Sequence, residues 1–436
     1  MSVATVGAVG PTAELGEPDA LRRAARGVRQ EVLADLPGLL EQFADGVLDR
    51  GGHICWASTA ADARHYVAGL VVRHNARRVV KARSMVTQEI GLDRAIEACQ
   101  AKVVETDLGE WIVQLADDAP SHVVGPQRHR SRRQVHDLFV ERAAAQRSAG
   151  TLPDGDDLVR FARERLRSEL LDAEIGISGA NLAVAETGSV VLVTSEGNAR
   201  LVTALPRVHV VVLGMERLAA TWSQADLLLA LLARSATGQR LSSSTSVLTG
   251  PRHRDERDGP DELHVVILDN GRSQVLGAEP HELLACARCG AALDVGALNR
   301  EVDGYGWVQP GPTGSALAPL LAGPDDLHTA GMGAAWTLCG ACLDACPVEV
   351  PLQDLLLSLR RAKSPQDGRA ERTAWRLWAA AWSDARRYGL TTRAVSWGRW
   401  ASRLSGHLPF GVGGESGDAV PPAAARFRDL WWRGRI

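Results

Sequence analysis

The sequence lacks a hydrophobic run long enough to cross a membrane. Its longest apolar stretches, such as Leu227 to Leu232, fall well short of the roughly 20 residues that a spanning helix needs. Residues 1–10 are small and apolar, but they lack the basic segment and the hydrophobic segment of a secretion signal. We therefore expect a cytoplasmic protein without a transmembrane segment.

The chain also has no excess of charge of one sign. Its 49 lysines and arginines nearly balance 52 aspartates and glutamates, which leaves a net charge of −3. No strongly basic surface is implied, so we expect no nucleic-acid partner. Hydrophobic residues make up 45% and charged residues 23% of 436 positions, a composition typical of a globular chain with two or three domains.

The texture of the sequence divides the chain into four parts. Residues 1–18 are rich in Gly, Pro and Ala and are predicted to form a flexible tail. Residues 19–272 begin with apolar positions at helical spacing and then alternate helical stretches with short β-branched runs. This alternation predicts an α/β domain with a largely parallel sheet. Residues 273–362 carry many glycines and five cysteines, and residues 363–436 form a helical, Arg- and Trp-rich region.

Periodicity within the α/β part predicts individual elements. Continuous β-branched runs indicate buried strands, and apolar positions three and four residues apart indicate helices. The predicted strands are Val79-Val80, Val103-Val104, 122–124, Val190 to Thr194, Val208 to Leu213 and Leu263 to Leu268, and the predicted helices are 88–99, 131–146, 156–172 and 222–234.

Two tight groups contain five of the seven cysteines. In the second group, Cys339, Cys342 and Cys346 have x2 and x3 spacing and are followed by Pro347. This pattern matches the last three ligands of the C-x2-C-x2-C-x3-C-P run that binds [4Fe–4S] clusters. Trp336 occupies the position of the missing first cysteine.

The first group has the same register but fewer thiols. Cys286 and Cys289 occupy the first two ligand positions, whereas Ala292 and Gly296 stand where the third and fourth cysteines belong. Ala297 also replaces the proline. In a chain without a secretion signal, such clustered thiols indicate metal binding rather than disulfides.

Five thiolates cannot supply the eight ligands of two cubic clusters. In two-cluster ferredoxins the cysteine before proline ligates the other cluster. On that crossed pattern, Cys286, Cys289 and Cys346 keep three ligands of one cluster, whereas Cys339 and Cys342 keep two of the other. The sequence thus allows one [4Fe–4S] cluster at most. Two alternatives stay open: the two C-x2-C pairs could hold one zinc ion, or the region could hold no metal.

A series of separated blocks carries a family resemblance. These blocks are 81–92 (Lys-Ala-Arg-Ser-Met-Val-Thr-Gln-Glu-Ile-Gly-Leu), 105–110, 120–122, 176–181, 185–189, 196–200, 249–251, 269–272, 305–307 and 310–312. Over about residues 20–436 the sequence resembles lactate utilization protein B, a LUD-domain family. The family's first cysteine run has four cysteines and a proline, a pattern from which this chain departs after Cys289.

The resemblance implies a fold and a function. The fold would be a LUD domain like that of the NagB/RpiA/CoA-transferase proteins, followed by an α-helical ferredoxin-like domain. The chain would be an iron–sulfur electron-transfer subunit of a bacterial complex that oxidises L-lactate to pyruvate, with other lactate utilization subunits as partners, rather than a complete enzyme. The alternative is a scaffold or ligand-binding subunit without redox activity, whose cysteine domain is metal-free or holds zinc.

Five residues are candidates for binding a small anionic substrate. Lys81 and Ser84 follow a predicted strand, where open α/β sheets bind ligands. Asn198 and Arg200 belong to a Gly-containing loop in which Arg could clasp a carboxylate. Glu186, before a predicted tight turn, is the candidate for a catalytic nucleophile or a ligand contact. Each also has a purely structural interpretation. Lys81 and Ser84 could mark a helix start, Asn198 and Arg200 a polar loop with an ion pair, and Glu186 a hydrogen-bond anchor.

Overall fold

The computed structural model describes residues 18–388, except 119, 121–124, 128, 146–155, 195, 241–243, 296–310, 323–335, 364–368 and 385. The chain forms two compact units, residues 1–360 and 361–436, which are described separately. The tail predicted before residue 18, the strand predicted at 122–124 and most of the predicted C-terminal helical region lie outside the described residues.

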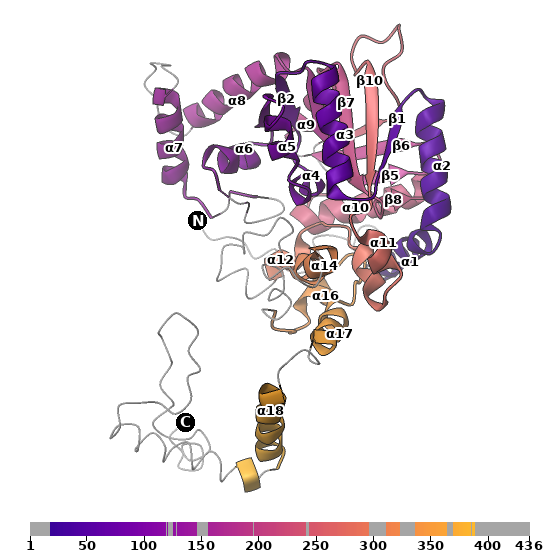
Figure 1. The fold of residues 1–436 in the computed structure, drawn as a ribbon, viewed down its shortest axis with the longest axis vertical. Coiled ribbons are helices and arrows are strands. Elements are labelled where there is room, and N and C mark those ends of the chain that lie inside the picture. The colour runs from indigo at the N-terminus through magenta and orange to yellow at the C-terminus, as the bar shows by residue number, and fades with distance from the viewer. Residues whose placement is uncertain are drawn as a thin grey trace. The chain divides into compact units, whose positions relative to one another are not determined.

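A six-stranded parallel sheet forms the centre of the first unit, in the order β1-β10-β7-β4-β2-β3 (Figure 1). Its strands are β1 (His53–Ala57), β2 (Arg78–Lys81), β3 (Lys102–Glu105), β4 (Ile175–Ser178), β7 (Val208–Gly214) and β10 (Glu262–Leu268). All seven residues of β7 are buried, as expected for a parallel strand covered on both faces. The predicted α/β class with a parallel sheet is confirmed.

A second, four-stranded sheet has the order β8-β5-β6-β9. Its strands are β5 (Leu182–Val184), β6 (Ser189–Thr194), β8 (Leu218–Ala219) and β9 (Ser244–Leu248). The tight turn between β5 and β6 contains Gly188 at φ 63°, where a Cβ would lie 2.4 Å from the carbonyl carbon of Gly46. Only glycine allows that approach.

Helices cover the parallel sheet and the second sheet. They are α1 (Pro18–Ala34), α2 (Leu36–Asp49), α3 (Ala60–Arg73), α4 (Met85–Glu89), α5 (Leu92–Glu97), α6 (Leu108–Leu115), α7 (Arg132–Ala145), α8 (Asp156–Leu171), α9 (Asn198–Ala204), α10 (Trp222–Thr237) and α11 (Arg272–Leu276). The helix predicted at 88–99 is divided into α4 and α5, because Gly91 between them is left-handed at φ 59°.

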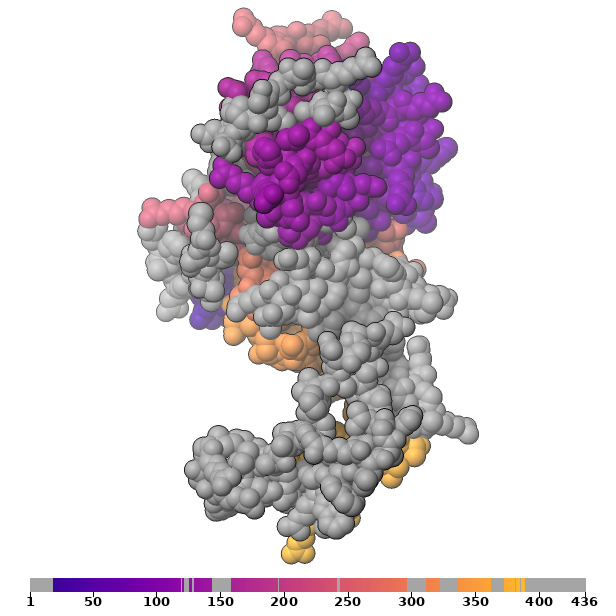
Figure 2. Space-filling model, turned by 90° about the vertical axis from the view of Figure 1, so that its left-hand side faces the viewer, coloured from indigo at the N-terminus to yellow at the C-terminus, as the bar shows by residue number. Residues whose placement is uncertain are grey.

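Two hydrophobic cores lie on opposite faces of the parallel sheet. One joins α3, α4 and α5 to the face that carries Val210 and Val266, and Figure 1 shows α3 in front of the sheet. The other joins α2, α9 and the second sheet to the face that carries Val211 and Val265. Figure 2, which views the molecule from the side of α7, shows the purple residues of that helix at the surface.

The cysteine region shares a third core with the α/β part. Its elements are the 3-10 helix η2 (Glu279–Ala285), α12 (Ala291–Val295), α14 (Pro312–Ala322), α16 (Ala341–Ala345) and α17 (Leu352–Lys363). Leu283, Leu317 and Val348 pack there with residues of α1 and α10, such as Ala25 and Leu228. The short helices are therefore held against the α/β domain rather than folded apart from it.

Little of the second unit is described. Its main element is α18 (Arg369–Trp382), on which Trp375, Trp378 and Trp382 follow one another in ring contact. All three indoles are exposed. Throughout the described residues, we find no helix with both the length and the apolar character that membrane crossing requires.

Candidate functional site

Three of the five clustered thiols line one small cavity. Cys286, Cys289 and Cys346 lie in its wall, and its volume is about 60 Å³. The short helices α12 and α16, one from each cysteine group, pack against each other. The structure thus brings together the set that the crossed ligand pattern predicts. Ala292, at the position of the missing third cysteine, lines the same cavity.

Backbone conformation aims amide groups at these sulfurs. Arg288 is left-handed at φ 54°, and its N–H donates to Cys286 Sγ at 3.3 Å. The N–H of Val350 donates to Cys346 Sγ at 3.4 Å. Amide hydrogen bonds of this kind to ligand sulfur are a recurring feature of iron–sulfur sites, where they adjust the reduction potential.

Two of the cavity thiols have strongly raised pKa values. Burial raises the pKa of Cys289 to about 12 and that of Cys346 to about 11. Both are therefore neutral thiols at neutral pH in the metal-free protein. A metal that binds here must displace their protons, because thiolates are the ligands.

The remaining two thiols of the clustered set differ from these three. Cys339 is exposed, and the backbone N–H of Ala341, followed by the side chain of Thr337, lowers its pKa. Cys342 is half-buried, and burial raises its pKa. Neither lines the cavity that contains the other three.

Two buried arginines lie beside the loop that begins the first cysteine group. Arg29 is 2% exposed and donates to four carbonyl oxygens, including those of Leu284 and Ala285 just before Cys286. Arg217 donates to the carbonyl oxygen of Cys286 at 3.0 Å. Within the described part of the chain, no carboxylate lies at ion-pair distance from Arg29 or Arg217. Neither arginine lines the cavity, whose charged wall residues are Arg288 and Glu216, but both add positive charge beside Cys286.

A chain of buried ion pairs ties the cysteine loop to the sheet. Arg288 contacts Glu216 at 3.1 Å, Glu216 contacts Arg272 at 2.9 Å, and Arg272 contacts Glu89 at 2.8 Å. Burial alone would raise the pKa of Glu216, but Arg272 and then Arg288 lower it to about 2. This series of ion pairs fixes α4, α11 and the loop before Cys289 relative to one another.

A second cavity, of about 270 Å³, lies where the order of the parallel sheet reverses. From β2 the chain goes outward to β3, whereas β4, β7 and β10 follow in the other direction. Ligands of open α/β sheets bind at such switch points, beyond the carboxyl ends of the strands. Ser84 and Asn198 line this cavity, and so do Arg217, Arg288 and Cys289. The last two residues also line the cysteine cavity, so the cavities share a wall.

Two other predicted ligand residues have partners within the protein. Lys81 is fully buried, and its Nζ lies 2.6 Å from Asp93 and 2.8 Å from Glu105. Glu186 accepts a hydrogen bond from the backbone N–H of Trp222 at 3.0 Å, at the start of α10. Neither residue lines the cavity at the switch point.

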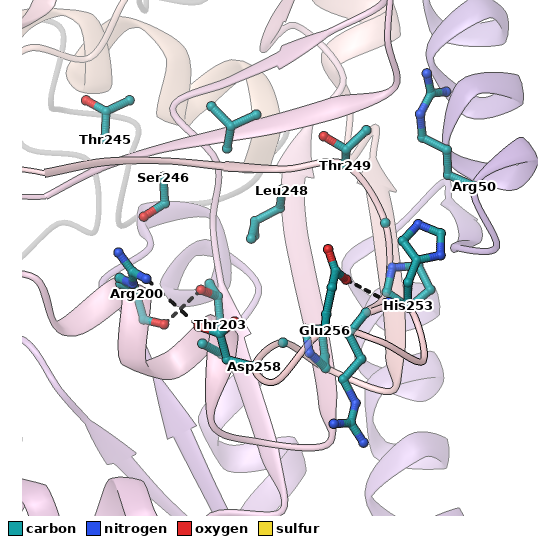
Figure 3. A pocket seen from close by; sticks show the side chains of 17 residues that line it. Arg50, Arg200, Thr203, Thr245, Ser246, Leu248, Thr249, His253, Glu256 and Asp258 are labelled. Atoms are coloured by element: carbon teal, nitrogen blue, oxygen red, sulfur yellow. Dashed lines mark hydrogen bonds and ion pairs between the residues drawn. The ribbon is translucent and has the colours of Figure 1, made fainter.

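Arg200 lies in a third cavity, of about 580 Å³, which Figure 3 shows. Its side chain is 70% exposed and lies 3.9 Å from Asp258. Asn198 and Arg200 diverge because successive helical residues turn by about 100°, which places residues two apart on different faces. The three residues Ser84, Asn198 and Arg200 therefore do not form one site.

Sequence reasoning missed the arginines around the thiols. Arg29 and Arg217 stand far from both cysteine groups in the chain, and no motif spacing marks them. The one available signal is an isolated charge among apolar neighbours, as for Arg29 in a helix whose inner positions are buried. Glu89 and Arg272 lie in the blocks that resemble the family but carried no predicted role.

The family of the chain follows from its similarity to known proteins. A model of the LUD domain matches residues 40–268, which include the parallel sheet. Lactate utilization protein B of Shouchella clausii is 42% identical over 97% of this chain and 90% of its own length. The protein of that name from Geobacillus kaustophilus is 41% identical over 98% of this chain and 90% of its own length. The chain belongs to the LUD-domain proteins and, among them, to the lactate utilization protein B family.

One solved structure is also similar. It is the crystal structure of a DUF162 family protein from Deinococcus radiodurans, at 16% identity and a TM-score of 0.28. The similarity covers 53% of this chain and 98% of that chain.

Proposed function

We propose that the chain is the iron–sulfur electron-transfer subunit of a complex that oxidises L-lactate to pyruvate. In this proposal Cys286, Cys289 and Cys346 hold one cluster, and residues 273–362 act as the ferredoxin-like part. The observation that carries it is the meeting of these three thiols in one cavity, with Arg29 and Arg217 buried behind the loop of Cys286. Relatives named lactate utilization protein B support the substrate and other lactate utilization subunits as partners.

The residues present fit such a group. When bound, the cluster supplies one-electron redox chemistry, whereas oxidation of lactate to pyruvate releases two electrons and two protons. The carrier must therefore pass the electrons on singly. Arg29 and Arg217 offset the negative charge of the thiolates, and amide N–H groups donate to two of the sulfurs. The apolar side chains of Leu293 and Leu317 restrict water in the cavity wall.

Ala292 determines the type of cluster that this proposal allows. The cavity offers three thiolates. The fourth ligand of the cluster would come from the third cysteine of the first group, where Ala292 has only a methyl group. A cube bound here needs a ligand other than cysteine at its fourth iron, or it loses that iron and becomes a three-iron cluster. We propose at most one cluster per chain for this reason.

The test is metal analysis of the anaerobically purified chain, with iron, acid-labile sulfide and zinc measured together. Three to four irons with matching sulfide are expected. Cys286→Ser and Cys346→Ser should each abolish iron binding, whereas Cys99→Ser, outside both groups, should leave it unchanged. A chain that remains iron-free after anaerobic reconstitution would refute the proposal. Zinc that depends on Cys339 and Cys342 as well would instead favour the zinc site.

A second candidate function is ligand binding at the switch point of the sheet. The observation that favours it is the 270 Å³ cavity, whose wall holds three arginines, Arg83, Arg217 and Arg288, against two acidic residues, Asp107 and Glu196. Small carboxylates such as lactate or pyruvate match that charge. Calorimetric titration of the metal-free chain with each acid tests this function alone. Ser84→Ala and Asn198→Ala should weaken binding, and His65→Ala, which changes an exposed residue of α3, should not.

A further inference from the structure

Three histidines and a glutamate meet at the amino-terminal edge of the parallel sheet, away from both cavities that Cys289 lines. His53 is the first residue of β1, Glu262 is the first residue of β10, and His74 follows the end of α3. In the parallel pairing His53 lies opposite His264. Residues two apart on a strand share a face, so Glu262 and His264 point to the same side.

The distances between the polar atoms are those of a compact ligand set. His264 Nε2 lies 3.1 Å from Glu262 Oε2, and His74 Nε2 lies 3.3 Å from the same oxygen. One ligand atom each from His53, Glu262 and His264 lie within 4.8 Å of one another. Tetrahedral zinc with bonds of about 2.0–2.1 Å holds its ligand atoms about 3.3 Å apart. To bind the ion, the widest pair of ligand atoms must close by as much as about 1.5 Å.

Within this group, one histidine nitrogen has no hydrogen-bond partner, and a tyrosine hydroxyl fixes the orientation of another histidine ring. His74 Nε2 is buried and has no hydrogen-bond partner, since its approach to Glu262 lacks the geometry of a hydrogen bond. Tyr66 Oη lies 2.9 Å from His264 Nδ1, which leaves the other ring nitrogen directed at the carboxylate. Metal-bound histidines are held by a partner on the second nitrogen in this way.

We propose that His53, Glu262 and His264 bind a divalent transition-metal ion of the zinc type, with His74 as the fourth ligand. Imidazole nitrogens select zinc and its neighbours over magnesium and calcium, which prefer oxygen. Because His53 is exposed, the site is open to metal from solution. The ion would join the edge strand β1 to β10 and to the end of α3. Its role is structural, and it is independent of the cysteine cavity.

The test is titration of the EDTA-treated full-length chain with Zn²⁺ and Co²⁺. One equivalent should bind in the Cys286→Ser/Cys339→Ser variant, which lacks a complete thiolate site. Bound Co²⁺ should show visible bands without the thiolate charge-transfer absorption of a cysteine site. His53→Ala and Glu262→Gln should each weaken Zn²⁺ binding at least about 100-fold, and Tyr66→Phe about 10- to 100-fold. His65→Ala is the matched control and should have no effect.

Two results would overturn the proposal. One is the absence of a bound equivalent in the double cysteine variant. The other is Zn²⁺ affinity that stays unchanged in both His53→Ala and Glu262→Gln. Because His264 is buried, its replacement could prevent folding, so the test uses variants of the exposed His53 and the partly exposed Glu262 instead.

Discussion

Replacement of Arg272 by Met should destabilise the protein strongly at neutral pH. Arg272 is fully buried between Glu89 and Glu216, whose side chains are 7% and 3% exposed. The variant leaves both carboxylates in the interior without their shared cation. Removal of one partner from a buried ion pair costs about 3–5 kcal/mol. The pKa of Glu216 supports the direction, because Arg272 is the largest of the cations that lower it from 4.5 to about 2.

The pH dependence gives this prediction a definite sign. A carboxylate whose pKa is lowered by folding contributes stability above the pKa of the unfolded chain, and this stability is lost as the pH falls. In the wild type the loss should run from about pH 4.5 down to about pH 2. In Arg272→Met the pKa of Glu216 rises, so the carboxyl becomes neutral sooner. The difference between variant and wild type should therefore shrink as the pH falls through this range.

Urea denaturation at pH 7 and pH 3 measures both effects. The control is Arg207→Met, because Arg207 pairs with Asp261 but its side chain is 85% exposed. Exposed pairs contribute about 0–1 kcal/mol, so the control should stay near the wild type. A cost below about 1 kcal/mol for Arg272→Met, or a cost of equal size at both pH values, would refute the reasoning.

Three further variants test other parts of the structure. Ala292→Cys should complete a set of four thiolates and give four irons per chain; an iron content and an electron paramagnetic resonance spectrum equal to the wild type would contradict this. Gly188→Ala should lower the thermal midpoint far more than Gly197→Ala, because the first places a Cβ against the Gly46 backbone and the second meets open space; equal shifts would be inconsistent with the turn. Glu186→Ala should cost about 1 kcal/mol, as loss of a helix cap does, without loss of lactate-dependent activity in the complex. A large loss of activity there would assign Glu186 a catalytic role instead.

The central strands were predictable because both of their faces are buried. Val208 to Leu213 and Leu263 to Leu268 are unbroken apolar runs apart from one histidine each, and each proved to be a strand. β1 was missed because His-Ile-Cys-Trp-Ala has little β-branched character, and β4 because Gly176 interrupts it. The strands β5 and β8, of three and two residues, are too short to show a period.

The candidate site was likewise predictable only where a sequence motif carries the information. The crossed ligand pattern of two-cluster ferredoxins predicts which thiols can share a ligand set, and Cys286, Cys289 and Cys346 do lie on one cavity. Contacts between distant segments leave no trace in spacing, so Arg29 and Arg217 could be located only in three dimensions. The loop predicted to hold Asn198 and Arg200 is instead the start of helix α9. The helix places these two side chains on different faces, so they cannot bind one ligand together.

The shared wall of the two cavities has a consequence for electron transfer under the proposed function. Arg217 and Arg288 line the cavity at the switch point; Arg288 also lines the cysteine cavity, and Arg217 donates to the carbonyl oxygen of Cys286. Burial, and then the neighbouring Arg288, lower the pKa of Arg217 to about 9, which reflects the cost of burying two cations side by side. An anion in either cavity relieves that cost. The first anion to bind therefore leaves less positive charge to stabilise the second, so a carboxylate ligand would make a cluster in the neighbouring cavity harder to reduce.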